Sequence, residues 1–208
     1  MAETRAAFLA AAAVAREAIA HAGVRVRWEE PSALAEMTVG ALVAHLGRAV
    51  TNVDRCLSAP EPTGGEPMSG AAYFVPVDPD LDSTINVRVR STSAEEALVG
   101  QRAVLGQMDR ALERLRARLE AEPQGRLVEV RDGEVLRLDE YLRTRIIELT
   151  VHTDDLCVSV GRETPALPGI GEAIQALVDV ATLRHGDLAV LRALARRERD
   201  PDQALRVI

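Results

Sequence analysis

The sequence predicts a mainly α-helical protein, built as a four-helix bundle with a small β-hairpin and a C-terminal helical extension. Long segments repeat apolar residues at helical spacing, Gly and Pro separate these segments, and one short segment alternates like a hairpin. With 208 residues, of which 47% are hydrophobic, the chain can bury a core. We expect the bundle over residues 1–165 and, over 166–208, an extension packed on the same domain.

Capping and turn residues delimit the first two bundle helices. Residues 2–22 have a helical pattern, and Gly23 is the expected C-terminal stop. Thr38 is the expected N-cap of a second helix that runs to about Leu57. The following segment, 58–83, is rich in Pro and Gly, and we expect one long irregular loop there. A loop of this length in a compact domain is more often a lid or the wall of a site than filler.

A third helix and a hairpin are expected next. Ser93 and Glu96 have the spacing of a capping box, which predicts a helix from there to about Glu120. Within the stretch "RLVEVRDGEVLRL", Asp132 and Gly133 form the dipeptide typical of a tight hairpin turn. The third helix of the bundle is therefore expected to lead into a small two-stranded element.

The fourth helix and the extension complete the expected bundle. Asp139 is the expected N-cap of a helix that runs to about Val160. Beyond it, two helical segments are expected over 170–184 and 187–199, separated at Gly186. These two segments make up the predicted C-terminal extension.

Composition excludes several classes of protein. The net charge of −7 argues against nucleic-acid binding, which needs a basic surface. All 25 basic residues are Arg, and Ala is abundant, which suggests a GC-rich genome such as an actinobacterium's. Cys56 and Cys157 are too few for a disulfide framework or a thiolate zinc site. No apolar run has the length of a membrane span, so we expect a cytoplasmic protein without a membrane partner.

The fourth helix places two candidate ligands one turn apart. In "LRTRIIELTVHTDDL", Glu148 and His152 lie about 40° apart around the helix, and Asp155 lies about 20° to the other side of Glu148. Apolar residues flank this strip on both sides. Helical periodicity is compatible with two interpretations. The polar strip either faces water, or it faces the interior of the bundle and supplies part of a metal site. Spacing alone is weak evidence, because Glu17 and His21 have the same separation.

His45 is the third candidate ligand. It lies at the edge of the apolar arc of the second helix, beside Thr38 and Ala49. Two imidazoles and a carboxylate can hold a divalent metal on one face and leave coordination positions open. The alternative is a histidine at the core edge that only satisfies its own hydrogen bonds.

Three further residues have two readings each. Asp155 either orients His152 or His45 through an imidazole N–H, or merely ends the polar strip. Arg145 either forms an ion pair on its own helix or holds an anionic substrate. Arg192, on the last predicted helix, either reaches the mouth of the site or belongs to a solvated basic face.

Three stretches resemble the mycothiol-dependent maleylpyruvate isomerase family. They are "PSAL…MTVGALVAHLG" after Trp28, "LDEYLRTRIIELTVHTDDLCVSVG", and "RHGDLAVLRALARRERDP". The resemblance covers the chain from about Trp28 to its end. It implies a DinB-like four-helix bundle and a divalent metal, typically zinc, bound by His45, Glu148 and His152.

The same resemblance implies a metal-activated thiol chemistry. Mycothiol would be the thiol co-substrate and would attack a small electrophilic substrate, in an isomerase or an S-transferase reaction. The donor set also suits Ni²⁺ or Fe²⁺. Two alternatives stay open, a non-catalytic metal-binding bundle that acts as a sensor or interaction module, and a bundle that binds no metal. A homodimer is compatible with all of these readings.

Overall fold

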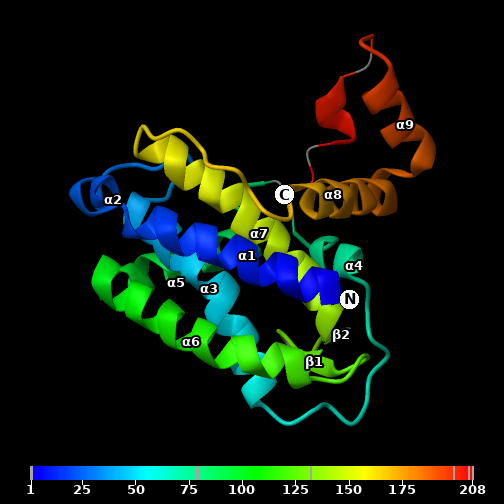
Figure 1. Ribbon diagram of the computed structural model, residues 1–208. Helices are drawn as coiled ribbons and strands as arrows, with labels where there is room; N and C mark the ends of the chain where they lie inside the picture. The colour runs from blue at the N-terminus through cyan, green and yellow to red at the C-terminus, as the bar shows by residue number, and fades with distance from the viewer. Residues whose placement is uncertain (1, 78–79, 132, 199, 206, 208) are drawn as a thin grey trace.

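A computed structural model describes residues 2–77, 80–131, 133–198, 200–205 and 207 of the chain. Four long helices form the bundle (Figure 1): α1 (Ala2–Ala20), α3 (Val39–Ser58), α6 (Gln101–Ala121) and α7 (Leu138–Ser159). Helices α1 and α3 each pack against both α6 and α7. Their facing sides bury a continuous apolar core. The predicted mainly α-helical bundle is therefore confirmed.

Shorter elements surround this bundle. They are α2 (Ala22–Val26), α4 (Gly70–Phe74), α5 (Thr84–Ala97), β1 (Leu127–Glu129), β2 (Val135–Arg137), α8 (Ile170–His185), α9 (Asp187–Ala195) and the 3-10 helix η1 (Pro201–Gln203). Helix α5 packs on α3, and α8 packs on α7 and α4. Figure 1 shows α9 standing away from the bundle beyond α8. The division of the chain into 1–165 and 166–208 stays a prediction.

The stretch around Trp28 packs closely on the start of α3. The backbone N–H of Gly40 donates to the carbonyl of Trp28 over 2.8 Å. A Cβ atom at Gly40 would lie 2.6 Å from Cε2 of the indole ring, which is closer than real side chains approach. Glycine at this position therefore lets the connector before α3 lie directly on the helix. Thr38 caps α3 as predicted, because its Oγ1 accepts from the N–H of Ala41.

The predicted stop at Gly23 is wrong. Helix α1 ends at Ala20, and Gly23 lies inside the short helix α2. The side chain of His21 starts this second helix, because its Nδ1 accepts a hydrogen bond from the N–H of Gly23 over 3.2 Å. The helix therefore restarts at Ala22, and Gly23 lies in its first turn.

The capping box predicted at Ser93 is also wrong. Helix α5 already begins at Thr84, directly after the predicted irregular segment 58–83, with Ser83 as its N-cap, and that segment contains the short helix α4. Ser93 lies inside α5, fully buried, and its hydroxyl donates to the carbonyl of Val89. The third bundle helix starts only after Gly100, whose φ of 78° breaks the helical path.

The predicted hairpin is confirmed. Strands β1 and β2 pair antiparallel, with Val128 opposite Leu136. Gly133 has a φ of 81°, as a tight turn requires, whereas Asp132 lies outside the described residues.

Two predicted helix boundaries need correction. Arg137, not Asp139, is the N-cap of α7, and Asp139 lies in the first turn of the helix. There Asp139 accepts a hydrogen bond from Nε of Arg5 over 2.8 Å, so it ties α7 to α1. The last predicted helix, 187–199, ends at Ala195, and residue 199 lies outside the described part of the chain.

We expect Gly40→Ala to destabilise the protein by about 1–3 kcal/mol, because the added methyl group forces Trp28 away from α3. Thermal unfolding, followed by circular dichroism, measures the change. Gly106→Ala in α6 is the control, since its Cβ would meet only the end of the Arg110 side chain at 3.4 Å. That substitution should stabilise the helix by up to ~1 kcal/mol. Equal effects of both changes would contradict the packing role of Gly40.

Candidate metal centre

Three side chains singled out by the sequence meet between α3 and α7. The Nε2 atom of His45, on α3, lies 3.0 Å from Oε2 of Glu148 on α7. One turn along α7, Nε2 of His152 lies 3.3 Å from the same oxygen. The two imidazole rings meet edge to face, with centroids 4.7 Å apart. The polar strip of α7 therefore faces α3.

The donor atoms of this cluster fit a divalent metal. His45, Glu148 and His152 offer one ligand atom each, and these atoms all lie within 4.8 Å of one another. The side chains keep 17%, 16% and 13% of their surface exposed, so the cluster is largely buried but still reaches solvent. Two imidazoles and one carboxylate suit zinc and other divalent transition metals. Their assignment as metal ligands stays a prediction.

Burial and hydrogen bonding act against each other in this cluster. Burial alone would raise the pKa of the Glu148 carboxyl, but the hydrogen bonds with His152 and His45 hold that pKa well below its usual value. Burial alone would lower the pKa of His152, but its bonds to Asp155 and Glu148 raise the pKa to about 9. The pKa of His45 is lowered, mainly because burial disfavours its charged form. Both shifts favour an ionised Glu148 carboxylate beside a protonated His152.

Asp155 holds the far nitrogen of His152. Its Oδ2 lies 2.9 Å from His152 Nδ1. Because an ionised carboxylate only accepts hydrogen bonds, Nδ1 carries a proton and Nε2 faces Glu148. A carboxylate in this position is the usual support of a metal-binding histidine. The sequence allowed two interpretations of Asp155, and this contact favours the one in which Asp155 orients His152.

His45 is held by a network that the sequence analysis missed. Nη2 of Arg48 lies 2.9 Å from His45 Nδ1, and a guanidinium can only donate hydrogen bonds. Nδ1 is therefore the acceptor, and Nε2 carries the proton that points at Glu148. Arg48 also donates to Oγ of Ser93 over 2.9 Å and to Oε2 of Glu96 over 3.0 Å. The spacing of His45 and Arg48, three residues apart, was the available signal, but nothing local indicates the partners on α5.

Arg145 lies behind Glu148, buried in the bundle. Its side chain is 8% exposed, and its Nη2 lies 3.8 Å from Oε1 of Glu148. The guanidinium also sits 5.0 Å from the centre of the Tyr141 ring and 5.5 Å from that of Tyr73. Within the described residues, this Nη2 makes no hydrogen bond. The contact favours the ion-pair reading of Arg145, in which it supports the carboxylate.

The structure does not bring Arg192 to this cluster. Arg192 is exposed on α9, which turns away at Gly186 and packs on α8 instead of folding back along α7 (Figure 1). Cys56 and Cys157 are both buried free thiols. Neither belongs to the group of potential ligands that the described residues form around His45.

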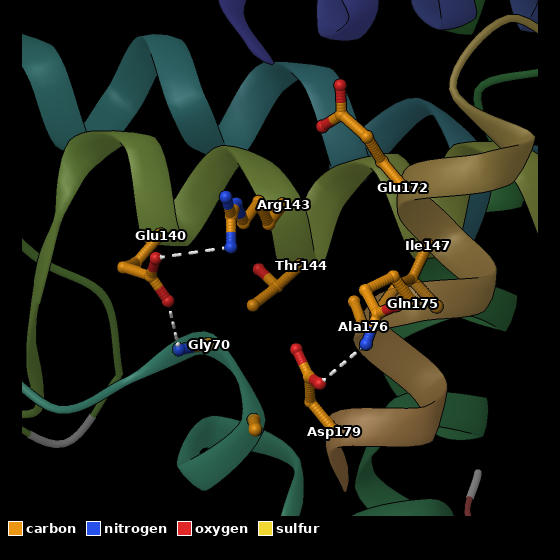
Figure 2. Close-up of a pocket in the computed structure, with 10 residues that line it drawn as sticks. Gly70, Glu140, Arg143, Thr144, Ile147, Glu172, Gln175, Ala176 and Asp179 are labelled. Carbon is orange, nitrogen blue, oxygen red and sulfur yellow. Dashed lines mark hydrogen bonds and ion pairs between the residues drawn. The ribbon is translucent and has the colours of Figure 1, made fainter. Parts of the chain in front are cut away.

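A separate hollow lies between α4, α7 and α8 (Figure 2). Some of the polar groups that line it pair with one another, whereas Oε2 of Glu172 is buried and has no hydrogen-bond partner among the described residues. Oε2 of Glu140 accepts from the N–H of Gly70 over 2.9 Å, and Nε2 of Gln175 donates to Asp179 over the same distance. This hollow contains none of the three candidate ligands.

Comparison with known proteins yields one family. The family model described as the mycothiol maleylpyruvate isomerase N-terminal domain matches residues 3–157, which include all of α2 to α6 and nearly all of α1 and α7. No curated protein and no solved structure matches the chain. No helix in the described part of the chain is long and apolar enough to cross a membrane.

Asp155→Asn should lower the pKa of His152, because a neutral amide stabilises the imidazolium less than a carboxylate does. In chelator-treated protein, NMR titration should give a value near 9 for the parent chain and a lower value for the variant. Asp154→Asn is the control, since Asp154 bonds Thr164 and not His152.

The same shift predicts a pH dependence of stability. The pKa of His152 is raised from 6.5 to about 9, so its contribution is fully present below about pH 6.5 and is lost as the pH rises through 9. The free energy of unfolding of chelator-treated protein should therefore fall over this range, and fall less in Asp155→Asn. An unchanged His152 pKa in that variant would rule out the orienting role of Asp155.

Proposed function

The chain belongs to the mycothiol maleylpyruvate isomerase N-terminal domain family, and we propose that it is a zinc-dependent enzyme that uses mycothiol on small electrophilic substrates. The observation that carries the proposal is the meeting of His45, Glu148 and His152 within 4.8 Å. Membership of the family supports the use of mycothiol and the binding of a metal. The two imidazoles and the carboxylate of the cluster also support the metal. The resulting reaction is an isomerisation or an S-transfer.

His45, Glu148 and His152 would hold the metal. When bound, a divalent metal lowers the pKa of a coordinated thiol from about 8.5, which makes the thiolate available near neutral pH. Zinc is the proposed metal because it accepts this mixed donor set in open sites, and Ni²⁺ and Fe²⁺ also suit it. The negative charge of Glu148 offsets part of the charge of the cation.

The two histidines differ in what they require before they can act as ligands. His152 has only to lose its Nε2 proton, because Asp155 already holds Nδ1–H in place. His45 needs its proton on Nδ1 instead of Nε2, and there it meets the donor Arg48. Arg48 would therefore turn away from His45 and keep its bonds to Ser93 and Glu96 on α5.

The proposed reaction needs no nucleophile from the protein. Addition of a thiolate to an activated double bond, followed by its release, gives isomerisation of the substrate. Displacement of a leaving group by the same thiolate gives S-transfer. Both thiols of the chain, at Cys56 and Cys157, are buried, which agrees with an external thiol as the attacking group.

The alternative function is metal binding without catalysis, in a sensor or an interaction module. Its support is the low exposure of the three donors, between 13% and 17%, which leaves little surface for a bulky thiol. Both functions share the metal and differ in whether mycothiol reacts.

His45→Ala and His152→Ala should each weaken zinc binding by more than about 100-fold, because each removes one of three proposed ligands. Competition with a chromogenic chelator measures the affinity. The chain contains four histidines, and His185→Ala at the end of α8 is the matched control that should leave zinc affinity unchanged. Parent-like affinity in both ligand variants would refute the assigned site.

Metal-loaded protein should convert a suitable electrophile when mycothiol is present, whereas chelator-treated protein should not. A panel of activated alkenes, cis-unsaturated acids and alkyl halides, followed by thiol titration and mass spectrometry, separates isomerisation from S-transfer. Isomerisation regenerates the thiol, and S-transfer consumes it. If a broad panel gives neither product, the protein binds metal without this catalysis.

A further inference from the structure

Helix α9 presents an apolar face to solvent. Leu188, Leu191 and Leu194 expose 56%, 61% and 60% of their surface. Val190, about 100° around the helix from Leu191, is buried, and α9 packs on α8. In Figure 1, α9 projects from the end of α8, away from the four bundle helices. Grouped exposed leucines on a projecting helix mark a contact surface.

The spacing of this face is symmetric about Leu191. Leu188 lies three residues before it and Leu194 three residues after it. At about 100° per residue, these two leucines lie about 60° to either side of Leu191. If a second copy of α9 runs antiparallel with Leu191 at the two-fold axis, Leu188 lies at the level of the partner's Leu194. The face is therefore complementary to itself, as the contact of a two-fold dimer must be.

Charge favours the antiparallel direction over the parallel one. Asp187 lies in the first turn of α9 and Arg196 is its C-cap, whereas Arg197 pairs with the neighbouring Glu198. An antiparallel pair brings the acidic start of each helix level with the basic end of the other, and it also opposes the helix dipoles. A parallel pair would set like charges against each other.

We propose that the leucine face of α9 is the contact of a homodimer, in which two copies of α9 pair antiparallel with Leu191 at the two-fold axis. The inference depends only on α9 and is independent of the metal centre and its chemistry. The helix has nine residues and a length of about 13 Å. Such a contact is smaller than the roughly 800 Å² per partner of standard interfaces, so the dimer should be weak and concentration-dependent.

Sedimentation velocity over a range of concentrations tests the association of the full chain. The parent protein should shift from monomer towards dimer as its concentration rises. Leu191→Glu should remain monomeric, because it places two carboxylates against each other at the two-fold axis. Leu98→Glu is the control, since Leu98 is 86% exposed and lies after α5. Circular dichroism checks that both variants keep the fold.

Cysteine crosslinking tests the register and the direction. At an interaxial distance of about 8–10 Å, the Cα atoms of residue 191 in two antiparallel copies lie within reach of a disulfide. The Cα atoms of residue 188 in the two copies lie at least about 9 Å apart along the axis, too far for a bond. Leu191→Cys should therefore form a covalent dimer on mild oxidation, whereas Leu188→Cys should not. The two native thiols are buried, which limits their interference.

Several results would overturn the proposal. One is a parent chain that stays monomeric at every concentration, with no crosslinking of Leu191→Cys. Another is association that persists unchanged in Leu191→Glu, which would place the contact elsewhere. Crosslinking of Leu188→Cys as efficient as that of Leu191→Cys would contradict the antiparallel register.

Discussion

The carboxylate of Glu148, shared by an imidazole from α3 and another from α7, is the interaction on which the centre depends. A largely buried carboxylate is costly unless charged or hydrogen-bonding partners compensate it. His152 supplies the compensating charge, His45 supplies a hydrogen bond, and Arg145 supplies a second positive charge from behind. This compensation explains why a polar strip of α7 can turn inward.

The two sides of the centre are supported unequally. Behind His152 stands an acceptor, Asp155, which is the arrangement that a metal-ligating imidazole needs. On the other side, Nδ1 of His45 accepts a hydrogen bond from Arg48, which stabilises the opposite tautomer, with the proton on Nε2. Arg48 in turn reaches Ser93 and Glu96, so α5 is linked through one guanidinium to the ring of His45. Under the proposed function, metal binding would therefore be coupled to the position of an arginine that is anchored on a neighbouring helix.

Much of the fold followed from local patterns in the sequence. Helical periodicity and the cap at Thr38 sufficed for α3, and turn chemistry sufficed for the hairpin. The errors arose where a tertiary contact decides the local structure. Ser93 has the spacing of a capping box, but it is buried in α5, where it holds Arg48. Asp139 has the chemistry of an N-cap, but its carboxylate instead binds Arg5 of α1.

The candidate site shows the same limit. The i, i+4 spacing of Glu148 and His152 was visible, but it equally described the pair Glu17 and His21, and only the fold separates the two. The tautomer of His45 depends on Arg48, whose orientation is set by Ser93 and Glu96 of α5, 45 and 48 residues further along the chain. Periodicity cannot report a contact of that kind, because it describes one element at a time.

X-ray diffraction from crystals of the zinc-loaded protein, collected at the zinc absorption edge, tests the central claim most directly. The account predicts one strong anomalous peak between α3 and α7, about 2.0–2.2 Å from Nε2 of His45, Nε2 of His152 and a carboxylate oxygen of Glu148. A map without a peak there, or with the imidazole of His45 turned away from α7, would contradict it.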